Sequence, residues 1–295
     1  MNKDSLKAKA RNMAQKYKLD SKYIIQNVMF EALIRRISIS KYKENIIIKG
    51  GFLLSSIFGF NQRSTMDMDA TLKGMNLTKD NVQSIIENII SIDIKDGIRY
   101  EIFSIKEMRL DKKYPGFKVH LLAYLDDLRT HLLIDLTTGD IITLKEIDYE
   151  YNTIFGDETI NILSYNIETI IAEKFEAIIS RSVVNSRMKD YYDLYMFTTT
   201  KWNNINKKIL VKAINNTCNC RNTIEFLKDS SYYINLIKED ENLKKLWIDY
   251  QSKNEYAKNI TFEDTIDAIN KINDLLLESE WNCVHFSCIL NIYLL

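Results

Sequence analysis

The chain has 295 residues, of which 46% are apolar and 27% charged, and its 40 basic residues balance 40 acidic ones. This composition excludes a disordered or fibrous protein, and the length is that of one large domain or two smaller ones. With one proline and eight glycines, the chain has few residues that break helices, so we expect it to be rich in helix.

The balanced total conceals a charge asymmetry along the chain. Residues 1–49 hold twelve Lys and Arg against four Asp and Glu, a net of +8, whereas residues 135–176 hold two against ten, a net of −8. The basic segment suits a polyanion such as RNA, and the acidic segment suits cations or a basic partner. Ordinary solvated helix faces are the alternative interpretation.

Cysteine content and hydropathy narrow the class of protein further. Four cysteines are too few for a disulfide scaffold, and their spacing does not match a zinc site. No apolar run reaches the ~18 residues that a membrane-spanning helix needs. We therefore expect a cytoplasmic protein without a membrane span, and the almost uncharged segment 281–295 has no assigned role.

Hydrophobic periodicity predicts a first domain over residues 1–160 that mixes helices and strands. Two amphipathic helices come first, followed by a strand, a Gly50-Gly51 turn and a helix, and then by further strands and one more helix. The last two strands are joined at 126–129 by a connection of hairpin length and should pair antiparallel. Helices are expected at 4–17, 21–37, 52–58 and 78–90, and strands at 45–49, 64–72, 98–105, 117–125 and 130–137.

From Ser164 onward the apolar period returns to 3.6 residues, which predicts a helical domain over residues 161–295. Its helices are expected at about 166–182, 187–199, 205–216, 221–228, 231–250 and 262–278. The predicted fold class is α+β: a mixed sheet with flanking helices, followed by a helical C-terminal domain.

Two aspartates stand out in the strand after the glycine turn. Asp67 and Asp69 are two residues apart, so their carboxylates point to the same face of the strand. Adjacent carboxylates repel unless a cation neutralises them, and this pair therefore predicts a divalent metal site for Mg²⁺. The Gly50-Gly51 turn, at the start of a helix, offers backbone N–H groups to phosphate. Solvated aspartates on an edge strand are the alternative.

A third carboxylate occurs on a later strand. Asp135 interrupts an apolar run, where a carboxylate is costly unless it is paired or bound to metal. If its strand lies beside the one that carries Asp67 and Asp69, the three carboxylates can hold two metal ions for an in-line phosphoryl displacement. Asp140, which follows a glycine, is interpreted as a turn residue.

A second cluster of charges lies on two predicted helices. Lys174 and Arg181 are seven residues apart, hence on one helix face, and could bind a triphosphate. Asp190 could orient Lys174, whereas Asp193 could form a surface pair with Lys189. A pair of charged helices on a solvated face is the alternative.

In order and spacing, these motifs resemble those of the AbiEii/AbiGii toxin family, within the nucleotidyltransferases of the DNA polymerase β type. The resemblance covers about residues 20–200. It rests on Lys49-Gly-Gly-Phe-Leu-Leu, Arg63-Ser-Thr-Met-Asp67-Met-Asp69, Ala172-Glu-Lys174-Phe-Glu-Ala177, Arg181 and Arg187-Met-Lys-Asp190-Tyr-Tyr-Asp193. Phe52 and Ala70 depart from the family pattern, in which a small hydroxyl residue and an aromatic residue are usual.

The resemblance implies a minimal nucleotidyltransferase fold, binding of Mg²⁺ and an NTP, and transfer of a nucleotide to an acceptor that is tRNA in some relatives. It also implies a toxin held back by a cognate antitoxin, as in a toxin–antitoxin or phage-defence pair. The predicted catalytic residues are Asp67, Asp69, Lys174 and Asp190; the predicted NTP-binding residues are Gly50, Gly51, Ser64, Lys174 and Arg181; the predicted metal ligands are Asp67, Asp69 and Asp135.

Two other functions fit parts of the same pattern. A D-x-D pair also serves metal-dependent glycosyltransferases, although the glycine turn and the helix with Lys174 have no obvious role there. A binding module that senses a nucleotide without turning it over is the non-enzymatic alternative.

Overall fold

The computed structural model describes residues 1–108, 116–156 and 158–292, and the side chains of these residues up to 279. The chain forms two compact units. The first consists of Met1–Asp140 and Lys145–Tyr165, and the second of Ile141–Leu144 and Asn166–Leu295. None of the described helices is long and apolar enough to cross a membrane.

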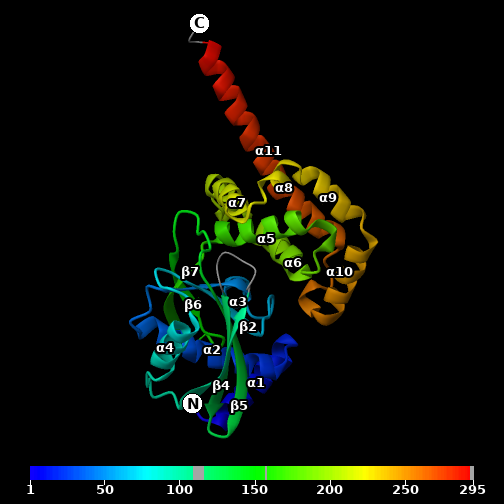
Figure 1. The fold of residues 1–295 in the computed structure, drawn as a ribbon. Coiled ribbons are helices and arrows are strands. Elements are labelled where there is room, and N and C mark those ends of the chain that lie inside the picture. The colour runs from blue at the N-terminus through cyan, green and yellow to red at the C-terminus, as the bar shows by residue number, and fades with distance from the viewer. Residues whose placement is uncertain (109–115, 157, 293–295) are drawn as a thin grey trace. The chain divides into compact units, whose positions relative to one another are not determined.

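Within the described residues, the first unit is built on a mixed seven-stranded sheet with the order β3-β4-β5-β2-β1-β7-β6 (Figure 1). The pairs β1–β7 and β2–β5 are parallel and the others antiparallel, including the predicted hairpin of β4 and β5. The strands are β1 Ile46–Lys49, β2 Asp67–Leu72, β3 Ile98–Met108, β4 Gly116–Leu125, β5 Leu128–Thr137, β6 Ile147–Asn152 and β7 Thr159–Ser164.

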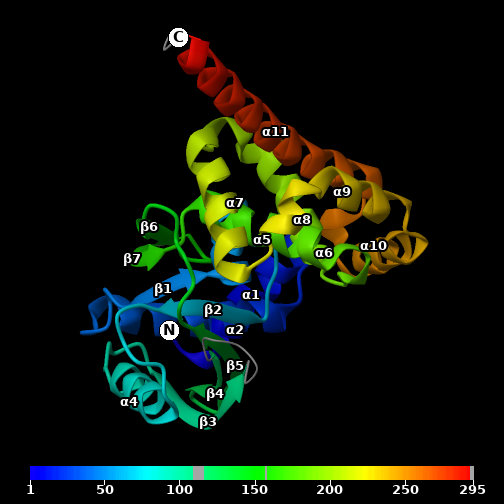
Figure 2. The same ribbon diagram turned by 45° about the horizontal axis from the view of Figure 1, so that its top comes forward.

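Helices cover one face of this sheet. The helices of the unit are α1 Lys3–Tyr17, α2 Ser21–Ile39, α3 Gly50–Phe58 and α4 Lys79–Ile90. Tyr100 of β3 donates a hydrogen bond of 2.8 Å to the carbonyl of Met29 in α2, and α4 packs beside β3 (Figure 2). Val119 and Leu121 of β4 point to this side and are fully buried. The opposite face of the sheet carries the alternate residues, among them Asp67 and Asp69.

The prediction that α2 is amphipathic is wrong, because α2 is buried on nearly all sides. It lies against the sheet, and α1 packs on it as well. Its buried charges are paired: Arg36 contacts Asp96 at 2.8 Å, and Glu31 accepts hydrogen bonds from the backbone N–H of Ile154 and from the Tyr151 hydroxyl. A helix that packs on two sides needs apolar residues all round.

The sequence pattern does not predict the two strands at the end of the sheet, β6 and β7. β7 alternates exposed and buried residues as a half-buried strand does, but β6, Ile-Asp-Tyr-Glu-Tyr-Asn, is mostly exposed and has a composition closer to that of a loop. The predicted boundary after residue 160 therefore cuts through β7.

The second unit is helical in the residues that the structure describes. Its α-helices are α5 Ile167–Arg181, α6 Met188–Met196, α7 Lys207–Arg221, α8 Ile224–Lys228, α9 Ser230–Glu239, α10 Glu241–Lys253 and α11 Phe262–Ile292. The single helix predicted at 231–250 is two helices, because Asp240 leaves the helical conformation and caps α10 by accepting from the N–H of Leu243. The last helix continues past the predicted end at 278. These helices and the mixed sheet confirm the predicted fold class.

Part of the charge asymmetry along the sequence is neutralised by internal ion pairs. Arg35 contacts Glu158 at 2.5 Å, and Lys49 contacts Asp140 at 2.5 Å. Both pairs join the basic N-terminal segment to the acidic segment. Part of the charge asymmetry is therefore taken up by ion pairs within the first unit.

Candidate active site

The glycine turn begins α3 directly after β1. Gly50 has φ +68°, and a Cβ built on it would lie 2.0 Å from Oδ2 of Asp69. A Cβ on Gly51 would lie 2.8 Å from the hydroxyl of Thr65. Position 50 therefore requires glycine for two reasons: the backbone is left-handed there, and the Asp69 side chain fills the space that a Cβ would need. The turn and the segment from Thr65 to Asp69 pack as one assembly.

The two aspartates of β2 have the alternation that the sequence predicts. Asp67 and Asp69 are half-buried, whereas Met68 and Ala70 between and after them are buried in the core. Thr65 donates a hydrogen bond of 2.5 Å to Oδ1 of Asp67. Two carboxylates side by side on one strand face are hard oxygen donors that fit Mg²⁺.

Asp135 lies beside Asp69 in the sheet. The parallel register of β2 and β5 pairs the two residues directly, so their side chains leave the same face. Oδ1 of Asp135 also lies 3.0 Å from the ammonium group of Lys118 on β4. In the described part of the chain, no group of three or more His, Cys, Asp and Glu side chains has the geometry of a metal site. The adjacency predicted for Asp135 is present, and its role as a metal ligand stays a prediction.

Asp140 is more than a turn residue, because its carboxylate is buried in a polar network next to the glycine turn. It accepts hydrogen bonds from Lys49 (2.5 Å), Thr137 (2.6 Å) and Thr71 (3.0 Å), and Lys49 also donates to Thr137 at 2.8 Å. Burial alone would raise the pKa of Asp140, but the charge of Lys49 and the hydrogen bonds from the lysine and the two threonines hold that pKa well below its usual range. The network fixes the end of β1 from which the glycine turn departs.

Two positions near the glycine turn differ in role. Ser64 is half-buried, and its carbonyl accepts a hydrogen bond of 2.6 Å from the buried Arg63; phosphate binding by its hydroxyl stays a prediction. Phe52, which departs from the family pattern, is fully buried and stacks on Tyr151 with ring centroids 5.0 Å apart. Phe52 is therefore a core residue of the first unit.

The predicted lysine of the second unit is held by two carboxylates. Lys174 in α5 lies 2.7 Å from Asp190 and 2.7 Å from Asp193, both in α6. The side chains of Asp190 and Asp193 are 2% and 0% exposed, whereas that of Lys174 is 12% exposed. The predicted contact between Asp190 and Lys174 is present. The alternative of a surface pair between Asp193 and Lys189 is wrong, because Asp193 is buried against Lys174.

Spacing in the sequence could have identified Asp193. Asp190 and Asp193 are three residues apart and thus on one face of α6. Burial alone would raise the pKa of Asp190, but the charges of Lys174 and Arg187 keep it below its usual value. The arrangement fixes the lysine ammonium group between two carboxylates. Arg181 is exposed at the end of α5, about 10 Å along the helix from Lys174.

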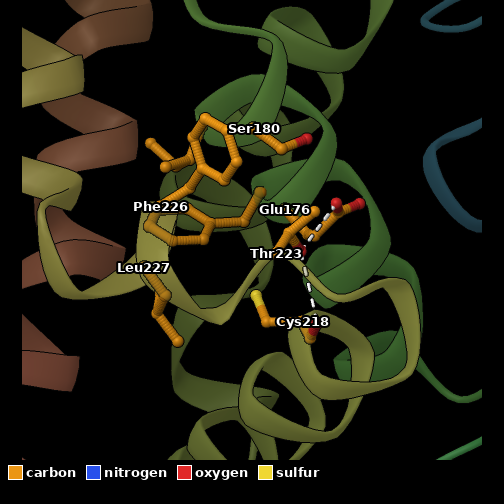
Figure 3. Close-up of a pocket in the computed structure, with 8 residues that line it drawn as sticks. Glu176, Ser180, Cys218, Thr223, Phe226 and Leu227 are labelled. Carbon is orange, nitrogen blue, oxygen red and sulfur yellow. Dashed lines mark hydrogen bonds between the residues drawn. The ribbon is translucent and has the colours of Figure 1, made fainter.

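The glutamates beside Lys174 have a structural role. Glu173 and Glu176 accept hydrogen bonds from Arg221 at 2.7 and 2.5 Å, and Glu176 also accepts one from Thr223 (Figure 3). A narrow hollow without space for a water molecule lies at this point between α5, α7 and α8. Its walls are mostly apolar, and the carboxylate of Glu176 is already paired, so we assign it no ligand. The lining residues are Phe175, Glu176, Ile179, Ser180, Cys218, Thr223, Phe226 and Leu227.

Comparison with protein families assigns this chain to the nucleotidyltransferases. The profile of the family described as "Nucleotidyl transferase AbiEii toxin, Type IV TA system" matches residues 31–268. The chain belongs to this family of nucleotidyltransferase toxins of type IV toxin–antitoxin systems, which confirms the resemblance inferred from the motifs.

Solved structures agree with the fold. JHP933 from Helicobacter pylori superposes with a TM-score of 0.54 at 16% identity, over 92% of this chain and 99% of JHP933. MenT4, a nucleotidyltransferase toxin from Mycobacterium tuberculosis, superposes with a TM-score of 0.52 at 11% identity, over 90% of this chain and 98% of MenT4. At such identities the likeness concerns the fold. A search of curated protein sequences gives no match.

Gly50→Ala tests whether the close approach to Asp69 matters for activity. Its matched control is Gly156→Ala, because Gly156 has φ +70° and its Cβ would meet no heavy atom of the described residues within 4 Å. Both variants carry the left-handed backbone cost of about 1–2 kcal/mol. We expect only Gly50→Ala to reduce nucleotidyl transfer, by about 10- to 100-fold, since it displaces a predicted metal ligand. Equal activity of the two variants would contradict this.

Asp140→Asn tests the buried pair with Lys49. A depressed pKa in the folded state gives stability that is fully present above the unfolded pKa, about 3.9, and is lost as pH falls through the folded value. We expect the variant to lower the free energy of unfolding by about 3–5 kcal/mol at neutral pH, because Lys49 stays buried without its partner. The difference from wild type should shrink below about pH 4.

Urea denaturation at neutral and at acid pH measures this difference. Asp148→Asn is the control, because Asp148 is exposed on β6. A difference between Asp140→Asn and wild type that does not change with pH would show that the ion pair does not stabilise the fold.

Proposed function

We propose that this nucleotidyltransferase toxin uses Mg²⁺ to transfer a nucleotide from an NTP to an RNA acceptor, with tRNA as the first candidate. The proposal is carried by one observation above all: the Asp69 carboxylate lies against Gly50, so the predicted metal ligand and the predicted phosphate-binding turn are adjacent. Family membership supports nucleotidyl transfer over glycosyl transfer.

Each residue of the first unit has one task in this proposal. The N–H groups of Gly50 and Gly51 at the start of α3, together with the Ser64 hydroxyl, bind phosphate oxygens of the NTP. Asp67 and Asp69 would hold Mg²⁺, with Asp135 as a third carboxylate beside them. When bound, the cation neutralises the charge on the triphosphate and aligns it for in-line attack by the acceptor hydroxyl.

The second unit supplies hydrogen-bond donors for the phosphates. Lys174 binds the phosphates that depart as pyrophosphate, and Asp190 and Asp193 keep its ammonium group in one position. Arg181, which is exposed, adds a bidentate contact to the triphosphate. Catalysis then consists of positioning and electrostatic stabilisation, without a covalent intermediate on the protein.

The partners follow from the family. A cognate antitoxin, encoded as a separate protein, would hold the toxicity in check, and the toxin would act in the cytoplasm, where the RNA acceptor and NTPs are available. The proposal therefore predicts that this chain alone inhibits growth and that the antitoxin relieves the inhibition.

Label transfer tests the proposed reaction. The full chain is incubated with tRNA, Mg²⁺ and each α-³²P-labelled NTP in turn, and we expect label on the RNA with at least one NTP. Asp67→Ala should reduce transfer by more than about 100-fold, the upper range for losing an outer partner of a metal ligand. The matched control is Asp148→Ala, on an exposed position of β6. Undiminished transfer by Asp67→Ala would overturn the metal role. Absence of transfer with every NTP would overturn the RNA reaction.

A further inference from the structure

The face of the sheet that carries Asp67 and Asp69 continues across β5, β4 and β3. On these strands it presents aromatic and basic side chains. Registers fix which residues share this face: Asp67 pairs with Leu133, and Leu133 pairs with His120. In the next row Asp69 pairs with Asp135, and Asp135 with Lys118. We call the part on β3, β4 and β5 the open sheet face; its aromatic and basic members are Arg99, Phe103, Lys106, Lys118, His120, Tyr124, Arg129 and His131.

Three aromatic rings form a row across the open sheet face. The centroids of Phe103 and His120 are 4.8 Å apart, and those of His120 and His131 are 4.9 Å apart. Nε2 of His120 and Nδ1 of His131 share a hydrogen bond of 2.7 Å. Phe103 is nevertheless 63% exposed, and His131 is exposed as well. The rings are therefore held by one another with surface left for a ligand to stack on.

Burial and the neighbouring charges of His131 and Lys106 lower the pKa of His120. This shift favours the neutral imidazole, and a neutral ring is suited to stacking on a base. Three rings in contact at a solvent-exposed strand surface form the kind of platform on which unpaired bases stack.

Positive charge lies beside this row. Lys106 and Lys118 occupy directly opposite positions on β3 and β4, an arrangement of like charges that is unfavourable in a sheet by itself. Lys118 is balanced by Asp135, but Lys106 has no acidic partner among the described residues. An anion bound between the strands would offset the repulsion, and a nucleic-acid phosphate is such an anion.

The distance to the predicted metal ligands fits a polynucleotide. Neighbouring strands lie about 4.8 Å apart, so His120, two strands from Asp67, is about 10 Å from it along the sheet. A chain whose terminal hydroxyl reaches the aspartates would thus cross the aromatic row within a few nucleotides.

We propose that the open sheet face binds the single-stranded end of the RNA acceptor, with bases stacked on Phe103 and His120 and a phosphate near Lys106. This rests on the proposed function, because it names the surface on which the acceptor of that reaction lies. Recognition by stacking is tolerant of sequence but requires unpaired bases, so the surface selects single-stranded ends over duplex.

The test measures, by fluorescence anisotropy, the binding of a fluorescein-labelled, unstructured oligoribonucleotide to the full chain. We expect Phe103→Ala to weaken binding about 5- to 150-fold, the effect of losing one stacked base, and Lys106→Gln to reduce the dependence of log K on log salt by about 1. Tyr232→Ala, which removes an equally exposed ring (61%) from α9 in the second unit, is the control and should bind as wild type does.

Binding by Phe103→Ala within twofold of wild type, or equal binding of a duplex of the same sequence, would overturn the inference. Thermal unfolding checks that the exposed substitution leaves the fold intact. The two proposals fail separately. If wild type labels RNA but Phe103→Ala binds it unchanged, the surface is wrong and the function stands. If Phe103→Ala loses binding but no NTP is transferred, the surface stands and the function is wrong.

Discussion

The close approach of Asp69 to Gly50 is the constraint on which the rest of the site depends. It follows from the register of β1 and β2, which pairs Lys49 with Asp69, and it requires a residue without a side chain at position 50. The same register turns Asp67 and Asp69 to one face and sends Met68 and Ala70 into the core. One strand pairing therefore determines the glycine, the two predicted metal ligands and the start of α3 together.

Buried lysines held by carboxylates recur in both units. Lys49 is paired with Asp140 beside the glycine turn, and Lys174 is paired with Asp190 and Asp193. Breaking such a pair costs more than forming it gains, because a buried charge is left unsatisfied. We interpret both ion pairs as holding side chains and backbone in fixed positions. Electrostatic stabilisation of the reaction then requires little rearrangement of the protein.

Much of this organisation was predictable from the sequence. Alternation identified the strand with Asp67, and an apolar run after a connection of hairpin length identified the strand with Asp135. The helical period identified the C-terminal unit. The local sequence pattern did not predict two elements whose structure depends on tertiary contacts. Helix α2 is buried on two sides, and β6 is a polar edge strand that is defined only by its pairing with β7. The sequence alone did not show the buried network of Asp140, because burial and ion pairing depend on residues far away in the chain.

The central claim is that Asp67 and Asp69 hold the divalent cation of an NTP complex, and binding of Mn²⁺ measured by electron paramagnetic resonance tests it most directly. We predict that wild type binds Mn²⁺ more tightly when a non-hydrolysable NTP is present, that Asp69→Asn loses this nucleotide-dependent binding, and that Asp148→Asn keeps it. Equal nucleotide-dependent Mn²⁺ binding by wild type and Asp69→Asn would contradict the account.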